Sequence, residues 1–308
     1  MRNPAGRNEV GRDWFGLDAF LPSERFVRDG AVLYLLKEVA STNDFLLGKG
    51  DAAVGRLCTW DGWGWTADAR RDLAPVAAPK PGTVVVARRQ TAGRGRQGRS
   101  WVDCGGLHLS VVIPSHRAYF SRGFSVWLGL MVVLSLREDF NVDARLKWPN
   151  DILCGDRKLG GILMERTGSG DRTAVVAGLG LNLTGGPADF PCGLMATATS
   201  LEHETDRLWR PATVSTAIIN RVVGDLDRFE SEGWEPWAEA MRCLDCLLGQ
   251  EVSLERADET FTGRAVGIDA QGRLQLETDP DTAMVFSAGN VHLRARRQIP
   301  TDATREET

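Results

Sequence analysis

Apolar and polar positions follow two different patterns along this chain, which divide it into a long mixed region and a shorter region of strands. Four short apolar runs rich in β-branched residues predict strands, at residues 31–39, 82–88, 106–113 and 173–183. Residues 121–140 are apolar on nearly every side, which predicts a helix buried against a sheet. Residues 145–165 predict two further strands joined by a turn at Gly155 and Asp156, and residues 211–248 predict two helices divided near Gly233.

Beyond Gln250 the pattern changes to short alternating runs separated by turn residues. These runs lie at residues 251–255, 262–269, 273–277, 283–287 and 291–294. Strict alternation is typical of half-buried antiparallel strands. The sequence therefore predicts a mixed α/β region followed by a small all-β unit of barrel type.

Three segments fit neither pattern. Residues 1–30 are polar without a sustained period and predict an arm, and residues 298–308 predict a disordered tail. Residues 48–80 carry three tryptophans among small and polar residues, which predicts a long loop. Such a loop is either a lid over a binding site or a variable surface insertion, and we favour the insertion.

The composition is that of a soluble globular protein. Of 308 residues, 43% are hydrophobic and 25% charged, and the net charge of −4 argues against a surface that binds polyanions as a whole. No apolar run is long enough to cross a membrane, and the N-terminal residues lack the apolar stretch of a secretory signal. We therefore expect a cytoplasmic protein.

The six cysteines show no spacing that indicates a disulfide framework. Cys243 and Cys246 form one C-x-x-C within a helical pattern, without a second pair or a nearby histidine. Metal binding or redox use stays open for this pair, and buried reduced thiols are the favoured interpretation.

The most unusual stretch is R-R-Q-T-A-G-R-G-R-Q-G-R-S-W at residues 88–101. Its first twelve residues hold five arginines, three glycines and no carboxylate. Glycine lets the backbone approach a ligand, and arginine donates to carboxylates and phosphates, so we interpret the stretch as a basic loop that an anion organises. A plain solvated loop is the alternative.

Known phosphate and nucleic-acid motifs do not explain the loop. It lacks the Walker pattern, and its G-x-G-x-x-G at residues 93–98 is followed by a strand instead of a helix. Nucleic-acid binding is disfavoured by the acidic total charge and by the absence of a reader motif.

Polar residues elsewhere complete a candidate site. Ser41 and Thr42 precede an apolar stretch and predict a helix cap more readily than a ligand contact. His108, within an apolar strand, predicts a structural histidine, and Asn182 at the end of another strand predicts either a local backbone contact or a pocket residue. The adjacent Gly160 and Gly161 predict close backbone approach.

A site that activates a carboxylate with ATP needs cations, a surface for adenine and a carboxylate for Mg²⁺. Candidate cations are Arg94, Arg96, Arg99, Lys147 and Lys158. Trp101 could stack on a base, and Asp151 could meet the metal or orient an arginine. No arrangement typical of a nucleophilic triad is visible, so a covalent enzyme intermediate is not needed.

Together these motifs are similar to those of the biotin protein ligases. The resemblance runs over residues 34–294 through S-T-N-D, Q-T-A-G-R-G-R-Q-G-R-S-W, K-W-P-N-D, R-K-L-G-G-I-L-M-E and G-L-G-L-N-L, in the family's order. It implies that biotin and MgATP give biotinyl-5′-AMP and pyrophosphate, and that biotin then passes to a lysine of a biotin carboxyl carrier protein domain, without DNA or a membrane as partner. A homodimer is left open.

The resemblance also implies a fold: an α/β (α+β) catalytic domain on a mixed sheet over residues 31–248, then a small SH3-like β-barrel over residues 249–297. Many relatives carry an N-terminal DNA-binding domain, and residues 1–30 are too short to form one.

Residue roles follow from the same resemblance. The resemblance implies that the biotin ring system is bound by Ser41, Thr42, Asn43 and Gln90, with backbone contacts from Gly93 and Arg94. Arg96 and Lys158 are the implied catalytic residues, holding the biotin carboxylate and later the acyl phosphate. The nucleotide falls to Arg94, Arg99, Trp101, Lys147, Asn150, Asp151 and Asn182, with Asp151 paired to Arg96 or bound to Mg²⁺.

Two rival functions are weighed against this one. Lipoate or octanoate ligases of the same superfamily carry an R-R-x-S-G-G-G-type loop, which differs from the sequence at residues 93–99. A biotin sensor without catalysis, or a nucleic-acid binder, would be expected to lack Lys158 or to carry a reader domain.

Overall fold

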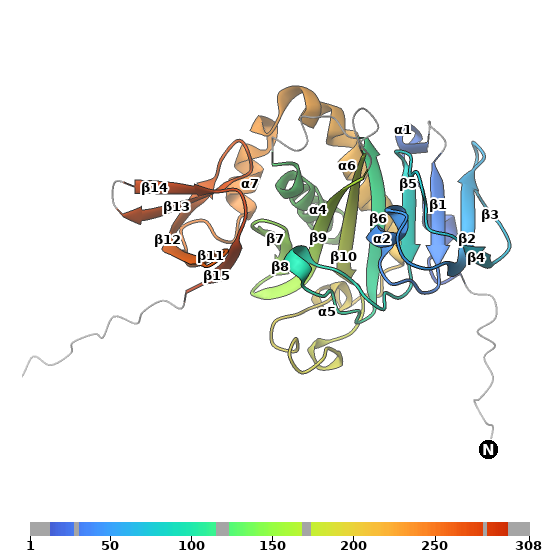
Figure 1. Ribbon diagram of the computed structural model, residues 1–308, viewed down its shortest axis with the longest axis horizontal. Coiled ribbons are helices and arrows are strands. Elements are labelled where there is room, and N and C mark those ends of the chain that lie inside the picture. The colour runs from blue at the N-terminus through green and yellow to red at the C-terminus, as the bar shows by residue number, and fades with distance from the viewer. Residues whose placement is uncertain (1–12, 28–30, 115–122, 168–173, 280–281, 295–308) are drawn as a thin grey trace, which may run out of the picture.

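The computed structural model describes residues 13–27, 31–114, 123–167, 174–279 and 282–294, and its centre is one ten-stranded sheet (Figure 1). The order is β3-β2-β1-β5-β6-β10-β9-β8-β7, with β4 paired to β2. Only β1 and β5 run parallel among the described pairs, which confirms the predicted mixed sheet. Its strands are β1 Val32–Leu36, β2 Ala53–Trp60, β3 Trp65–Ala67, β4 Arg71–Leu73, β5 Thr83–Ala87, β6 Gly106–Pro114, β7 Ala144–Lys147, β8 Asp151–Cys154, β9 Arg157–Thr167 and β10 Ala174–Asn182.

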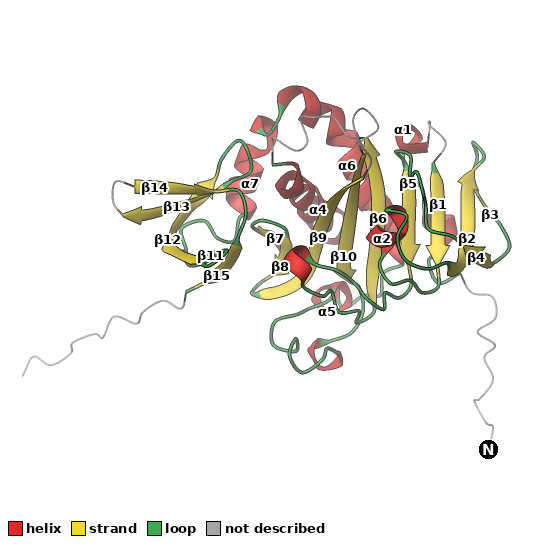
Figure 2. Cartoon of the chain, in the orientation of Figure 1, coloured by secondary structure: helices red, strands yellow, loops and turns green. Residues whose placement is uncertain are grey.

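Helices pack on both faces of this sheet (Figures 1 and 2). The two longest, α4 and α6, lie side by side on one face, and the short α2 lies on the other. The helices are α1 Glu24–Val27, α2 Thr42–Leu46, α4 Phe124–Phe140, α5 Leu201–Thr205, α6 Pro211–Glu232 and α7 Ala238–Leu244, with 3-10 turns η1 Leu17–Ala19, η2 Arg96–Gly98, η4 Pro187–Asp189 and η5 Glu235–Trp237. The predicted helix pair divided at Gly233 is confirmed.

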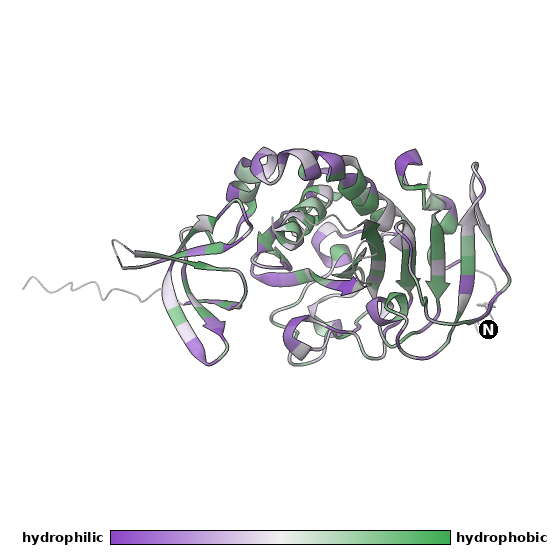
Figure 3. Ribbon diagram, turned by 45° about the horizontal axis from the view of Figure 1, so that its top comes forward, coloured by the Kyte–Doolittle hydropathy of each residue, from purple (hydrophilic) through white to green (hydrophobic). Residues whose placement is uncertain are grey.

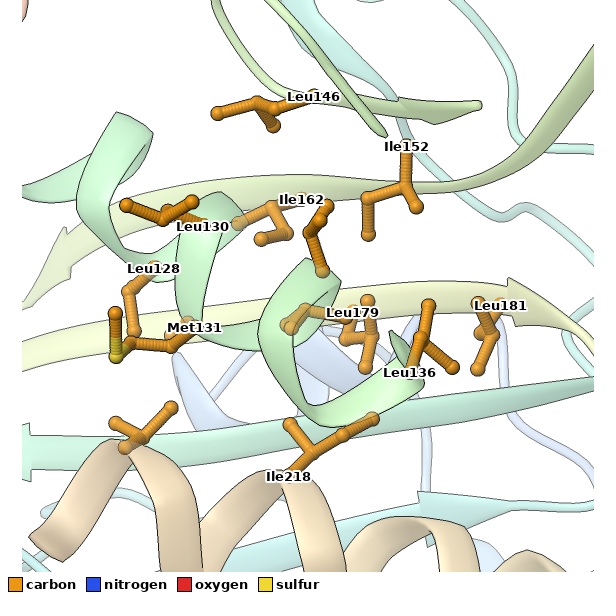
Figure 4. Close-up of a cluster of buried hydrophobic side chains, with 14 of the residues drawn as sticks. Leu128, Leu130, Met131, Leu136, Leu146, Ile152, Ile162, Leu179, Leu181 and Ile218 are labelled. Carbon is orange, nitrogen blue, oxygen red and sulfur yellow. The ribbon is translucent and has the colours of Figure 1, made fainter. Parts of the chain in front are cut away.

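Strand alternation separates two apolar clusters, because successive side chains of a strand point to opposite faces. On β5, Val84 and Val86 join the core under α4 and α6, whereas Val85 and Ala87 join the cluster that contains α2. Hydrophobic residues accordingly concentrate on the strands and on the helices that cover them (Figure 3). Figure 4 shows the larger cluster, in which Leu179 of β10 lies among side chains of α4 and α6.

The C-terminal unit is a five-stranded antiparallel sheet in the order β14-β13-β12-β11-β15, as the alternating pattern predicts. Its strands are β11 Glu251–Arg256, β12 Glu259–Ile268, β13 Leu274–Asp279, β14 Thr282–Phe286 and β15 Asn290–Leu293. It packs against the main domain where Trp148 Nε1 donates to Gly272 O at 2.9 Å. Gly123 also abuts Gly272, and a Cβ on Gly123 would come 2.5 Å from Gly272 Cα, so both positions require glycine.

Three expectations need correction. Residues 48–80 are not a loop, because β2 pairs with β1 and extends the sheet, with β3 and β4 at its edge. Residues 145–165 begin with an extra strand, β7, and so give three strands instead of two. The part of the predicted arm that the structure describes is packed: Phe15 and Phe20 are fully buried, and Ser23 N donates to Asn220 Oδ1 on α6 at 2.6 Å.

Other expectations concern cysteines, membranes and the C-terminal tail. All six cysteines are free thiols. The prediction of buried thiols is wrong for Cys243, which is exposed, and Cys246 is only half-buried. No helix in the described part of the chain combines the length and the apolar character needed to span a membrane. The predicted tail at residues 298–308 lies outside the described residues.

Candidate active site

The floor of the candidate site is a strip of the main sheet, on the face opposite α4 and α6. One cross-strand row runs from His108 on β6 through Gly180 on β10 and Gly161 on β9 to Asp151 on β8. Two central positions of this row are glycines, so the sheet presents bare backbone there. This hollow is the close approach that the Gly160–Gly161 pair predicts, and Gly161 is the residue of that pair that faces the site.

Glycines on β10 are required by what lies over them. A Cβ on Gly180 would sit 2.5 Å from the indole of Trp101, and a Cβ on Gly178 would collide with the amide of Asn43. The two glycines therefore let Trp101 and Asn43 lie close against the sheet, with Trp101 over Gly180 in the row and Asn43 over Gly178.

The basic loop folds over this floor through backbone hydrogen bonds. Thr91 N and Ala92 N donate to Val39 O and Ala40 O at 3.0 and 2.9 Å, which prolongs the pairing of β1 with β5. Farther along the loop, Trp101 N donates to Gly93 O at 2.8 Å. Gly93 is buried there, because a Cβ would come 2.6 Å from the Trp101 carbonyl oxygen.

Floor and loop enclose a small cavity of about 120 Å³. Eleven of the predicted site residues line it: Ser41, Thr42, Asn43, Gln90, Arg94, Arg96, Arg99, Trp101, Asn150, Asp151 and Lys158. Pockets that hold drug-sized ligands usually measure several hundred Å³, so side chains now inside this cavity must move to admit a ligand of that size.

Polar side chains at one end of the cavity form a connected network. Ser41 caps α2, accepting from Asp44 N at 3.4 Å, as predicted. The Thr42 backbone N–H and hydroxyl donate to Gln90 Oε1 at 2.8 and 3.1 Å. Ser110, which the sequence did not single out, is fully buried, and its hydroxyl lies 2.7 Å from Thr42 Oγ1 and 2.6 Å from Asn43 Oδ1.

The loop arginines differ in how far carboxylates neutralise them. Arg94 pairs with Glu165 and, at 3.3 Å, with Asp44, and the hydrogen bond that Arg94 donates to Glu165 is the main reason that the pKa of Arg94 is raised. Arg96 donates to the neutral Asn150 at 3.3 Å, and burial is the main cause that lowers its pKa. Because no carboxylate contacts it among the described residues, Arg96 is better placed than Arg94 to meet an incoming anion.

Lys158 stands at the centre of the site. Its Nζ donates to Asp151 Oδ1 at 2.6 Å and lies 5.8 Å from the centroid of the Trp101 ring. The predicted pairing of Asp151 with Arg96 is therefore wrong. The β8–β9 pairing explains the difference, since its irregularity after Ile152 sets Lys158 across from Leu153. Leu153 is two residues along β8 from Asp151, so Lys158 and Asp151 lie on the same face of the sheet.

A second cavity, of about 430 Å³, lies on the other side of Lys158. Trp101, Asp151 and Lys158 line both cavities, while Lys147 and Asn182 line only the second. The Asn182 amide also donates to Thr199 O at 2.9 Å, a backbone group 17 residues away. Asn182 is therefore a pocket residue, as one of the two alternatives predicted, and its backbone contact is not local.

The C-terminal unit contributes to the second cavity, which sequence reasoning missed. His292 and Leu293 on β15 line its wall, and Arg99 of the basic loop donates to Asn290 on the same strand. No local signal marks these three β15 residues, because only the docking of the two sheets brings them to the site.

A larger cavity lies elsewhere and is not the candidate site. It measures about 520 Å³, between the sheet and α6, and its lining is apolar apart from Arg25 and Asp227, which pair with each other. A functional pocket needs convergent polar groups, and this cavity has none that are free among the described residues.

The described residues form no cluster of three or more histidine, cysteine or acidic side chains that could hold a metal ion. Asp151 is one carboxylate between two cavities. That arrangement suits Mg²⁺ that phosphates already hold, since such Mg²⁺ is bound through one or two carboxylates.

Comparison with known proteins gives consistent matches. The biotin/lipoate A/B protein ligase family matches residues 64–182, and the biotin protein ligase C-terminal domain matches residues 247–294. The biotin--[acetyl-CoA-carboxylase] ligase of Paracoccus denitrificans is 31% identical over 213 residues, which cover 67% of this chain and 88% of that protein. The bifunctional ligase/repressor BirA of Bacillus subtilis is 32% identical over 227 residues, covering 72% of this chain and 70% of that protein.

Solved structures agree with this result. A biotin protein ligase from Aquifex aeolicus in complex with biotin and ATP superposes with a TM-score of 0.66 at 26% identity, covering 85% of this chain and 98% of that chain. A Leishmania major biotin protein ligase with biotinyl-5-AMP, at 21% identity and a TM-score of 0.50, shares the fold.

Proposed function

The chain belongs to the biotin protein ligase family, and from that premise we propose that it activates biotin as biotinyl-5′-AMP and transfers it to a lysine of a biotin carboxyl carrier protein domain. The observation that carries the proposal is the position of Lys158 on the wall shared by a small polar cavity and a larger cavity. One cation there can contact an acid in the first and a nucleotide in the second.

In the first half-reaction the biotin carboxylate attacks the α-phosphate of ATP, and pyrophosphate leaves. The small cavity takes the ring system, with the Thr42–Gln90 network as its hydrogen-bonding end. Arg96 and Lys158 meet the carboxylate and the phosphate together, which offsets their mutual repulsion and holds them in line for attack.

In the second half-reaction the amine of the carrier lysine attacks the acyl carbon, and AMP leaves. Negative charge grows on the acyl and phosphate oxygens, which Lys158 stabilises. The adenine lies on Trp101, and the remaining phosphate contacts fall to Arg99, Lys147 and Asn150. Asp151, which lines the second cavity, would be the carboxylate that holds Mg²⁺ of MgATP, and the ion would offset charge on the phosphates.

The decisive experiment is ATP–pyrophosphate exchange by the purified protein with biotin and lipoate in parallel. We expect exchange with biotin and none with lipoate, because the polar end of the small cavity suits a ring that carries N–H and C=O groups. Exchange with lipoate alone would overturn the assignment. Transfer is then tested by mass spectrometry of a carrier domain, with a variant lacking the acceptor lysine as control.

We expect bound ligand to protect the loop that closes the small cavity from cleavage by trypsin. Arg88, Arg89 and Arg99 are exposed, so trypsin should cut the loop readily in the free protein and poorly with biotin and ATP. The small volume of the cavity supports this, because the loop must reopen to admit a ligand. Cleavage at the exposed Arg71 on the distant edge strand β4 serves as the internal control. Equal loop cleavage in both states would contradict ordering by ligand.

A further inference from the structure

Next to the small cavity lies a pair of side chains, the buried His108 and the half-buried Asp103. The His108 side chain is fully buried on β6, and its Nε2 lies 3.1 Å from Asp103 Oδ1. The approach is bent from the line of an ideal hydrogen bond, and no other described acceptor reaches Nε2. Asp103 also accepts from Gln90 N and Gly105 N, both at 3.0 Å.

The surroundings of Asp103 keep it ionised. Burial alone would raise the pKa of this carboxyl, but the His108 contact and the N–H groups of Gly105 and Gln90 outweigh burial and lower the pKa to about 2. An ionised carboxylate only accepts hydrogen bonds, so the histidine nitrogen that faces it, Nε2, carries a proton.

The position of that proton determines what His108 does on its other side. In a neutral imidazole with Nε2 protonated, Nδ1 is an acceptor. Nδ1 lies 3.4 Å from Gln90 Nε2, which therefore donates to it. The Gln90 oxygen then points the other way, where it accepts from the Thr42 backbone N–H and hydroxyl at 2.8 and 3.1 Å.

We propose that Asp103 and His108 are positioning residues that fix the direction of the Gln90 amide, and thereby present its oxygen to a cyclic urea N–H in the small cavity. The urea N–H takes the place of the Thr42 hydroxyl, which can rotate away, while the Thr42 backbone N–H stays bound to the same oxygen. This inference rests on the proposed function and deepens it, because it names a determinant of ring recognition. A dithiolane ring has no N–H to donate, so a fixed acceptor here favours the urea.

The opposite orientation of the amide is incompatible with its neighbours. If His108 carried its proton on Nδ1, two donors would face each other until the Gln90 amide turned over. The turned amide would point its NH₂ group at the Thr42 backbone N–H, again donor to donor, and leave a buried donor unpaired. One tautomer of His108 therefore corresponds to one competent orientation of Gln90.

Two variants of His108 separate this role from packing. In His108→Asn the amide oxygen is as many bonds from the backbone as Nδ1, so it can accept from Gln90. In His108→Gln the terminal amide group is as many bonds from the backbone as Nε2. It therefore reaches Asp103 and leaves the Gln90 NH₂ group without its acceptor. Both lose the same ring. We expect biotin Kd to rise about tenfold in His108→Gln, as for one misdirected hydrogen bond, and to stay near the parent value in His108→Asn.

The readouts of this comparison are binding and kinetics together. Calorimetry gives biotin Kd, and exchange assays give kcat at saturating biotin and KM for ATP. The reacting groups lie at Arg96 and Lys158, so both kinetic values should stay unchanged while biotin affinity falls. A packing role would weaken the two variants alike, and equal biotin Kd in both variants would overturn the proposal.

The tautomer is tested directly by ¹⁵N NMR of the histidine ring. We expect protonated Nε2 and unprotonated Nδ1 in the parent. In Asp103→Asn the side-chain NH₂ can face His108, which should shift the proton to Nδ1 and weaken biotin binding, as replacing the carboxylate of a catalytic triad inverts its histidine. A proton on Nδ1 in the parent would overturn the proposal. If the parent neither binds biotin nor supports exchange, the proposed function fails instead.

Discussion

Replacing Lys158 with alanine is expected to lower biotin-dependent ATP–pyrophosphate exchange on the order of 10²- to 10³-fold, the effect of removing one preorganised donor from a developing charge. Lys158 is the cation that lines both cavities, so its loss affects the acid and the phosphate together. The fold should survive, because the Lys158 side chain is 39% exposed and its backbone stays paired with Thr197 and Thr199.

Companion variants identify which property of Lys158 matters. Lys158→Met keeps the length of the side chain without its charge, so its exchange rate should be as low as that of Lys158→Ala. Lys158→Arg keeps charge in a wider planar group and should recover only part of the rate, since the Asp151 contact at 2.6 Å fits a compact ammonium. The exposed Lys49, which lines neither cavity, gives the control Lys49→Ala. Rates near the parent value in Lys158→Ala, with thermal unfolding unchanged, would remove Lys158 from the chemistry.

The elements that were predicted correctly are those whose signal is local. The runs after Gln250 alternate cleanly, and each became a strand. The prediction of a loop at residues 48–80 was wrong because β2 mixes exposed and buried positions and contains Gly55, so its strand propensity is weak. Its pairing with β1 is a tertiary interaction that outweighs this weak propensity. The edge strands β3 and β4 then form by pairing with β2. A short window of sequence around either strand gives no information about this pairing.

Motifs predicted which residues line one cavity, but they did not predict which hydrogen bonds and ion pairs these residues form with one another. The motifs at residues 41–44 and 88–101 reach one cavity because β1 and β5 are parallel neighbours whose ends meet. Which carboxylate meets which cation depends on register, and so Asp151 pairs with Lys158. His108 is packed and hydrogen-bonded, as predicted, but its link to Gln90 joins segments that only the sheet brings together.

A second large effect is expected on stability, at Asp245 between α7 and the C-terminal sheet. Asp245 is only 7% exposed, its Oδ1 accepts from Leu247 N at 2.9 Å, and its Oδ2 has no hydrogen-bond partner among the described residues. Burial raises its pKa from 3.8 to about 6, against the weaker effect of the Leu247 hydrogen bond. Cys246 N donates to Leu146 O on β7 at 3.0 Å, so this incompletely paired carboxylate lies beside the contact between β7 and the segment that leads into the C-terminal unit.

The sign of the pH effect follows from this raised pKa. Between pH 3.8 and about 6 the folded protein binds more protons at Asp245 than the unfolded chain does, so this group makes stability fall as pH rises through that window. The shift of about two pKa units corresponds to about 3 kcal/mol of unfolding free energy. Asp245→Asn has no charge to bury and escapes this loss.

The measurement is urea unfolding of parent and Asp245→Asn between pH 3.5 and 8. Asparagine can still accept from Leu247 but brings an unpaired NH₂, so the absolute difference at one pH is ambiguous. The change of that difference with pH is unambiguous, because the unpaired NH₂ contributes equally at every pH. We expect the variant to gain about 3 kcal/mol on the parent from the acidic to the alkaline end. Asp72→Asn, at an exposed edge position, provides the control. A difference that stays flat with pH would mean that the Asp245 carboxylate has a partner in solution.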